Sequence, residues 1–245
     1  MSFRTKIIQK LIHLNERIFF YPKLRKFYTS HLIKRDVRII DVGANKGQSI
    51  DFFLKIYPDA GIEAFEPNKN LFVYLQNKYK STRKIELHNF GVSNVEGILE
   101  FHENIMDETS SFEELNLNSK YLETKARMLG VSKENIIIDN YDVKVIRLQD
   151  FLELRKDTFF DVLKIDVEGH ELQTLEGLFS GNANKIMIQF IQFESHNDDM
   201  YMNKNQHHRI EDILTQNGYE CIAKIKHGFG DFHEIIYENK NIHEA

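Results

Sequence analysis

The chain has 245 residues, of which 42% are hydrophobic, and it carries a net charge of −5. This length suits one α/β domain with a sizeable core. Its single cysteine, Cys221, excludes an intramolecular disulfide. No run approaches the ~20 apolar residues of a membrane span, and no signal peptide is recognisable at the N-terminus. We therefore expect a cytoplasmic protein.

Charge is unevenly distributed along the chain. Residues 1–36 hold nine Lys or Arg against Glu16 and Asp36, a net of +7, so residues 37–245 carry −12. This segment has apolar residues at helical spacing, namely Ile7, Leu11, Leu14 and Ile18. We therefore predict that 1–36 is a basic helical extension, and that its apolar stripe packs on a domain formed by 37–245. Contact with the anionic inner face of a membrane is the alternative. The acidic body disfavours nucleic-acid binding.

The first element of the domain is a strand that ends in a glycine-containing turn. An apolar run covers 37–42 and contains Asp41 near its end. Gly43 and Gly47 then flank a small polar turn, and a helical pattern covers 47–56. Glycine is needed where φ is positive or where a Cβ would collide with a ligand. The following helix presents free N–H groups to the turn. The turn thus predicts a binding site for a small anionic or nucleotide ligand.

A second strand, over 61–66, ends in Glu66 and is followed by Pro67. An acid at this position can bind the two hydroxyls of a ribose. A structural alternative is that Glu66 complements the dipole of the helix predicted over 68–79. A third strand follows at 85–90, and an additional edge strand at 97–101.

Residues 103–140 interrupt the alternation of strands and helices. They include a helix near 119–129 that Gly130 ends, followed by a polar stretch up to Tyr141. An insertion of this length is usually functional, and this one follows the third strand, at the ligand-binding end of the sheet. We expect it to form a lid over the acceptor pocket.

The remaining elements complete an α/β fold. Strands are predicted at 143–148, 160–166 and 185–193, helices at 172–179 and 208–217, and a hairpin from 219–225 and 231–237. The run over 160–166 is apolar enough to be a central, fully buried strand. A hairpin is antiparallel, so the last strand must run against the others.

Three motifs closely resemble the FkbM family of S-adenosylmethionine-dependent methyltransferases. They are Asp41-Val-Gly-Ala-Asn-Lys-Gly47, Phe65-Glu66-Pro67 and Leu163-Lys-Ile-Asp-Val-Glu-Gly-His-Glu171. The resemblance covers about 37–196, and the third motif is the most specific. It implies a Rossmann-like class I methyltransferase sheet of order 3-2-1-4-5-7-6 with helices on both faces. The implied activity is O-methylation of a hydroxyl on a sugar, glycan or related natural product.

The resemblance also implies where S-adenosylmethionine binds. Its amino-acid end should lie over Gly43, Ala44, Asn45 and Gly47, with Asp41 near its ammonium group. Glu66, followed by Pro67, should bind the ribose, and the adenine should lie near Asn89, Gly91 and Val92.

The base that takes the acceptor's proton is left open by the sequence. Asp166 ends the buried strand that the family places beside the glycine turn, so it is the first candidate as base or positioning group. Glu168, His170 and His196 follow strand ends nearby and are further catalytic candidates. A structural ion pair with Lys164 is the alternative for Asp166. The acids and histidine around 166–198 could also supply oxygen and nitrogen ligands to a magnesium ion, but they fit no fixed metal motif, so no metal is predicted.

Two rival functions remain. An NAD-dependent oxidoreductase could use a similar Rossmann-like half, although Asn45 replaces a glycine of the dinucleotide fingerprint. A catalytically inactive methyltransferase fold could serve as a partner or glycan-binding protein. The sequence does not identify the acceptor, the methylated position or the oligomeric state.

Overall fold

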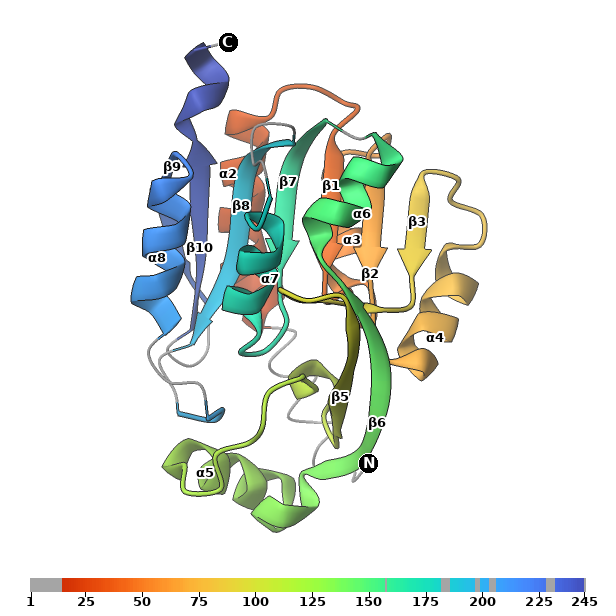
Figure 1. Ribbon diagram of the computed structural model, residues 1–245, viewed down its shortest axis with the longest axis vertical. Helices are drawn as coiled ribbons and strands as arrows, with labels where there is room; N and C mark the ends of the chain where they lie inside the picture. The colour runs from red at the N-terminus through yellow and green to blue at the C-terminus, as the bar shows by residue number, and fades with distance from the viewer. Residues whose placement is uncertain are drawn as a thin grey trace.

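A seven-stranded sheet forms the centre of the molecule in the computed structural model, which describes residues 15–156, 158–181, 186–196, 199–202, 206–227 and 232–244. Its strands lie in the order β3-β2-β1-β7-β8-β10-β9 (Figure 1). They are β1 (Arg38–Val42), β2 (Gly61–Phe65), β3 (Ile85–His88), β7 (Phe159–Ile165), β8 (Met187–His196), β9 (Tyr219–Lys226) and β10 (Phe232–Asn239). Only β10 pairs antiparallel, with β8 and with β9. The family-implied strand order is therefore confirmed.

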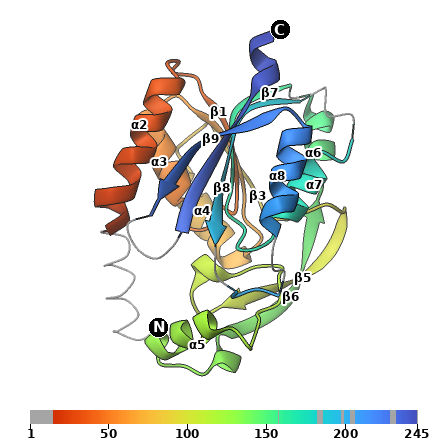
Figure 2. The same ribbon diagram turned by 90° about the vertical axis from the view of Figure 1, so that its left-hand side faces the viewer.

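Helices cover both faces of this sheet, as Figure 2 shows with α2 and α3 on one side and α6, α7 and α8 on the other. The helices are α2 (Tyr21–His31), α3 (Gln48–Ile56), α4 (Lys69–Tyr79), α6 (Leu148–Arg155), α7 (Glu171–Leu178) and α8 (Gln206–Gln216). Separate hydrophobic clusters fill the two interfaces. Strand β7 is buried at every position after its first residue, as expected for a central parallel strand with helices on both faces.

The N-terminal helical segment packs on the sheet as part of the core. A π-helix, Glu16–Phe20, runs directly into α2. Phe20, Leu24 and Tyr28 repeat at a spacing of four and are buried, and the Tyr28 hydroxyl donates to Gln192 on β8 at 2.5 Å. Ile18, from the predicted apolar stripe, is 54% exposed, and the other three residues of that stripe lie outside the described part of the chain. In the described part of this segment, the side chains that pack on the sheet are therefore Phe20, Leu24 and Tyr28 rather than Ile18.

The insertion belongs to a second, three-stranded sheet of order β4-β6-β5. Its elements lie beyond the carboxyl ends of the parallel strands (Figure 1). They are β4 (Gly91–Val92), β5 (Gly97–Asn104), the 3-10 helix Asp107–Thr109, α5 (Lys120–Leu129), the 3-10 helix Lys133–Asn135 and β6 (Ile137–Ile146). Ser119 caps the N-terminus of α5, and Gly130 ends the helix with a φ of 75°, as the sequence predicts.

Two features in this region differ from the sequence-based expectation. The polar stretch before Tyr141 is not a loop, because β6 begins at Ile137 and pairs antiparallel with β5. Its residues Asp139 and Asn140 are exposed, so they lack the alternation that would indicate a strand. The predicted strand over 143–148 ends at Ile146, and Leu148 instead begins α6, a helix that the sequence analysis missed.

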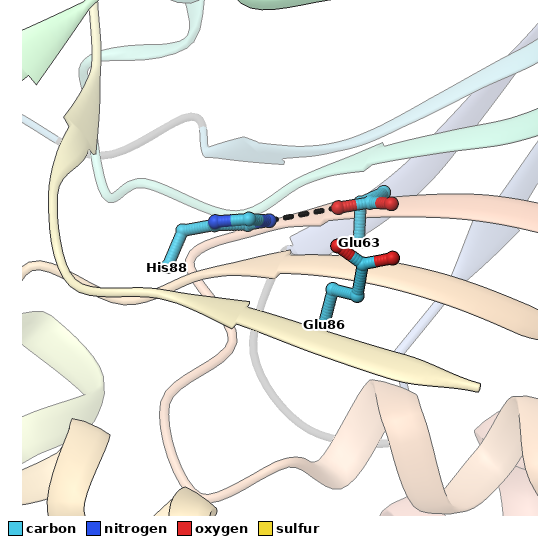
Figure 3. A group of neighbouring side chains, drawn as sticks. All are labelled: Glu63, Glu86 and His88. Carbon is cyan, nitrogen blue, oxygen red and sulfur yellow. Dashed lines mark hydrogen bonds and ion pairs between the residues drawn. The ribbon is translucent and has the colours of Figure 1, made fainter. Parts of the chain in front are cut away.

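An ion-pair network joins β2, β3 and α6 at the edge of the main sheet. The His88 ring bonds Glu63 at 2.7 Å, and Glu86 lies beside them (Figure 3). Arg155 donates to Glu63 and to Glu86, both at 2.8 Å. The guanidinium offsets the repulsion of two carboxylates that face each other on paired strands. We therefore interpret this cluster as structural.

Within the described residues, no helix has both the length and the apolar character that crossing a bilayer requires.

Candidate active site

A cavity of about 320 Å³ opens at the carboxyl ends of the parallel strands, within the ~300–1,000 Å³ usual for small-molecule sites. It brings together segments that are distant in sequence. Its walls include 43–45, 66–68, 90–92, 106–112 and 166–168, together with residues of the N-terminal helical segment and of β8 and β10. The three motif regions of the sequence therefore meet in one cavity.

The glycine turn has the backbone that its sequence predicts. Gly43 and Gly47 have φ values of 87° and 79°, and Asn45 has 47°. A Cβ on Gly43 would lie 1.8 Å from the Asp166 carbonyl oxygen, and one on Gly47 would lie 2.3 Å from the Tyr79 hydroxyl. Close packing within the protein therefore already requires glycine at both positions.

The N–H groups of the turn are used in hydrogen bonds within the protein. Gly43 and Ala44 donate to the Phe65 carbonyl, and Gly47 donates to Ala44. Asn45 donates to Glu66, and Lys46 to the side chains of Asn45 and Gln48.

The first turn of α3 is the better anion-binding element. Its leading N–H groups have no earlier helical carbonyl to bond. Gln48 and Ser49, the first two residues of α3, line the cavity, whereas Gly47 does not. The sequence analysis named neither residue, although the helix that follows the turn indicated them.

Glu66 is fixed at the cavity by two backbone donors. Its Oε2 accepts from the Asn45 N–H at 2.7 Å, and its Oε1 accepts from the Asn68 N–H at 2.8 Å. Burial raises the pKa of Glu66 to about 7, although these two bonds counteract it. The neighbouring Pro67 also lines the cavity. A buried carboxylate held in this way is preorganised to accept hydroxyl groups.

Of the residues predicted to lie near the adenine, two line the cavity and one supports the cavity wall. Phe90, Gly91 and Val92 line the cavity. Asn89 does not, and its amide instead donates to the carbonyls of Glu66 and Pro67 at 2.9 and 3.1 Å. Asn89 thus fixes the loop that carries Glu66.

Asp41 lies beneath the cavity and is fully buried. Burial raises its pKa to about 6, although the Lys164 charge acts in the opposite direction. Lys164 stands beside it on the neighbouring strand. Asp41 does not line the cavity, and its place near the ammonium group of the donor stays a prediction.

Lys164 and Asp166 form an ion pair within the cavity wall. The Lys164 ammonium lies 2.7 Å from Asp166 Oδ2. Burial alone would lower the pKa of Lys164, but the charges of Asp166 and Asp41 raise it well above its usual range. Lys164 is therefore charged, and it holds the Asp166 carboxylate at the cavity. The ion pair that was the alternative reading of Asp166 is present, and Asp166 still lines the cavity.

Carboxylates converge around Asp166. One oxygen from each of Asp166, Glu168 and Glu194 lies within 4.8 Å of the others, and all three residues line the cavity. Glu168 adopts a φ of 52° and accepts from the Tyr201 hydroxyl at 3.1 Å.

In the described part of the chain, neither candidate histidine has a side chain placed with these three carboxylates. His170 is 4% exposed and does not line the cavity, and both of its ring nitrogens bond protein side chains. His196 ends β8, but its side chain lies outside the described part.

Aromatic and charged residues form the end of the cavity beyond Asp166. Phe20 and Tyr21 come from the N-terminal helical segment, Tyr121 from α5 and Phe232 from β10. His227 stacks on Phe20 with ring centroids 4.0 Å apart.

Carboxylates surround the His227 ring, with Glu16 and Glu234 each 3.7 Å away and Glu194 at 4.0 Å. Burial alone would lower the pKa of His227, but these carboxylates raise it to about 10. His227 is therefore a cation at neutral pH. No short motif marks this residue or Glu234, so sequence reasoning missed both.

Comparison with known proteins agrees with this architecture. The chain is similar to the 2-O-methyltransferase NoeI of Sinorhizobium fredii, with 23% identity over 207 residues, or 84% of this chain and 82% of NoeI. It is also similar to Methyltransferase 1 of Beauveria bassiana, with 31% identity over 157 residues, or 58% of this chain and 59% of that protein.

Among solved structures, magnesium protoporphyrin IX methyltransferase from Synechocystis, determined with bound S-adenosylmethionine, has a TM-score of 0.51 and 11% identity. The match covers 97% of this chain and 83% of that protein. It shows a shared fold. The profile of the methyltransferase FkbM domain matches residues 41–221, which include all three motifs. The chain therefore belongs to the FkbM family of methyltransferases, whose methyl donor is S-adenosylmethionine.

Proposed function

We propose that this enzyme transfers the methyl group of S-adenosylmethionine to a hydroxyl of a sugar or glycan. The observation that carries the proposal is the single cavity shared by Glu66, the N-terminus of α3 and the Asp166 carboxylate. The 2-O-methyltransferase name of NoeI supports an oxygen acceptor. Membership of a methyltransferase family removes the oxidoreductase alternative.

The residues of the cavity fit the parts of the donor. Glu66 would accept from the ribose hydroxyls, and the N–H groups of Gln48 and Ser49 would bind the carboxylate. Phe90 and Val92 supply apolar contacts for the adenine. When bound, S-adenosylmethionine supplies an electrophilic methyl group on a sulfonium, and the protein's task is then to position an acceptor oxygen.

Asp166 is the proposed base and positioning group for the acceptor. Its carboxylate accepts a hydrogen bond from the hydroxyl and takes the proton as the new carbon–oxygen bond forms. Lys164 orients this carboxylate, with its ammonium 2.7 Å from Oδ2. The aromatic rings at the far end of the cavity, which include Tyr21 and Phe232, suit the apolar faces of a sugar ring.

A label-transfer experiment tests this function. The enzyme is incubated with methyl-labelled S-adenosylmethionine and a panel of neutral glycosides, uronic acids and amino sugars, and the products are analysed by mass spectrometry and NMR. We expect an O-methyl product together with S-adenosylhomocysteine, and no product from the Glu66→Ala variant at the same donor concentration. Label found only on an amine or carboxyl group would contradict the proposal.

Cofactor affinity should depend on the ionisation of Glu66. With a pKa near 7 in the free protein, Glu66 is increasingly protonated below pH 7 and loses acceptor capacity for the ribose hydroxyls. Linkage then predicts that the Kd for S-adenosylhomocysteine rises roughly tenfold from pH 8 to pH 6. Calorimetry at pH 6, 7 and 8 measures this. The Glu66→Gln variant should bind more weakly and with a flat profile, and an equal slope in the variant would assign the titration to another group.

The insertion, which the sequence predicts to cover the acceptor pocket, is proposed as a lid over the donor. Met106–Phe112 line the cavity, and Asp107 lies 2.6 Å from the ammonium of Lys46 in the glycine turn. We expect hydrogen exchange over 107–129 to slow when S-adenosylhomocysteine binds, because the ligand adds contacts beneath this wall. Unchanged exchange in the saturated protein would reduce the insertion to a fixed surface element.

A further inference from the structure

Three buried side chains form a continuous hydrogen-bonded chain next to the catalytic turn. His170 Nδ1 lies 2.6 Å from Glu113 Oε1, and His170 Nε2 lies 2.9 Å from Ser93 Oγ. The three residues are 4%, 9% and 1% exposed, respectively. His170 caps α7, Glu113 belongs to the insertion, and Ser93 follows β4. The chain thus joins three separate segments.

A serine, a histidine and a carboxylate in this order have the geometry of a nucleophilic catalytic triad. A nucleophile must reach its substrate, and Ser93 is almost completely buried. None of these three described residues lines the cavity. The three residues therefore connect parts of the protein and do not act on a substrate.

The chain fastens the insertion to the segment that carries Asp166. Glu113 also accepts from Gln173 on α7 at 3.0 Å. Close by, the Ser111 hydroxyl donates to the Val167 carbonyl at 3.3 Å and accepts from the Glu113 N–H at 3.0 Å. The stretch 111–113 is thus held along 167–173.

The turn that precedes His170 needs such support. Glu168 and Gly169 both have positive φ values, 52° and 96°, and a glutamate in this region is strained unless its surroundings hold it. A Cβ on Gly169 would lie 3.0 Å from the Tyr201 ring and 3.5 Å from Glu113. Glu113 therefore packs directly against the turn that presents Glu168 to the cavity.

We propose that His170 is a positioning residue that latches the insertion to the catalytic turn through Glu113 and Ser93. It maintains the cavity wall formed by 106–112 and the orientation of Glu168. This inference rests on the proposed function in one respect, namely that this wall covers the bound donor. His170 is then not the base, because both of its ring nitrogens are engaged in the latch.

Hydrogen exchange of the ligand-free protein tests the latch independently of any catalytic role. In His170→Ala and Glu113→Ala, exchange over 107–116 should accelerate at least tenfold, and the double variant should exchange no faster than either single one. His170→Gln, which can keep one of the two bonds, should lie between these and the wild type.

The matched control is His88→Ala. It also breaks a histidine–glutamate bond, the 2.7 Å contact to Glu63 in Figure 3, but at the edge of the sheet and outside the cavity wall. It should leave exchange over 107–116 unchanged. If His170→Ala exchanges there no faster than His88→Ala, the latch does not exist and His170 only begins α7.

Kinetics then separate positioning from base catalysis. In folded His170→Gln, we expect the KM for S-adenosylmethionine to rise about tenfold, with the pH profile of kcat keeping its shape. A base would behave differently, since its loss would remove an ionisation from that profile. Disappearance of a limb of the profile, with KM unchanged, would overturn the positioning role. Failure to methylate any acceptor would refute the proposed function, but it would leave the exchange result intact.

Discussion

Turnover of the Asp166→Asn variant is expected to fall by ~10²–10⁴, the usual contribution of a positioned acid or base. The substitution nearly conserves volume but removes the charge and the capacity to take a proton. Asp166 follows directly after the buried strand β7, and its N–H donates to the Val42 carbonyl at 2.9 Å. Its backbone is therefore fixed, and cofactor affinity should largely survive. Steady-state rates with the acceptor found by label transfer measure the effect, and calorimetry checks donor binding.

Asp161 offers a matched control on the same strand. It is fully buried, accepts from the Arg38 N–H at 2.7 Å and pairs with Lys34 at 2.8 Å, but it does not line the cavity. Asp161→Asn should lower the melting temperature while leaving the turnover of the folded enzyme within a few fold of wild type. If Asp166→Asn behaves in the same way, Asp166 is structural and Glu168 becomes the next residue to test.

Substituting Gly43 by alanine is expected to destabilise the fold by at least ~3 kcal/mol, a large part of the ~5–15 kcal/mol that stabilises a typical domain. A left-handed φ costs an alanine ~1–2 kcal/mol. The larger cost arises because the Cβ would lie 1.8 Å from the carbonyl oxygen of Asp166. Relief requires β1 and β7 to move apart, since the obstacle is backbone. Urea denaturation measures the change.

Gly61→Ala is the control for glycine loss as such. Gly61 begins β2, and a Cβ there would meet nothing within 4 Å. This variant should be as stable as wild type or slightly more stable, because alanine restricts the unfolded chain. A Gly43→Ala protein of normal stability that fails to bind S-adenosylhomocysteine would show that the ligand, not Asp166, requires the glycine.

The sequence predicts most of the fold because strand ends and helix ends carry local signals. Gly43 and Gly47 mark the turn after β1, and Ser119 and Gly130 mark both ends of α5. The unbroken apolar run of β7 indicates a central strand. The order of the strands came from the family resemblance, since local patterns do not specify which strands pair.

Contacts between distant segments are what the sequence could not predict. Nothing in the local pattern around Glu113 or Ser93 indicates that both bond His170, and a histidine after a strand end reads equally well as a base. The use of the turn's N–H groups likewise depends on Phe65, which ends β2, and on Glu66, which follows it. Helix α6 was missed because its start directly follows a strand without an intervening turn.

The two ends of the cavity are completed at different stages of synthesis. The donor end is built from 43–45, 48–49, 66–68 and 90–92, whereas the far wall combines Phe20 and Tyr21 with His227, Phe232 and Glu234. A ribosome therefore releases the donor half early, but the far wall cannot assemble until β9 and β10 have emerged. A nascent chain that stops before β9 would lack the partner that Glu16 and Phe20 require. The complete cavity is thus available only to a chain that has been synthesised through β10.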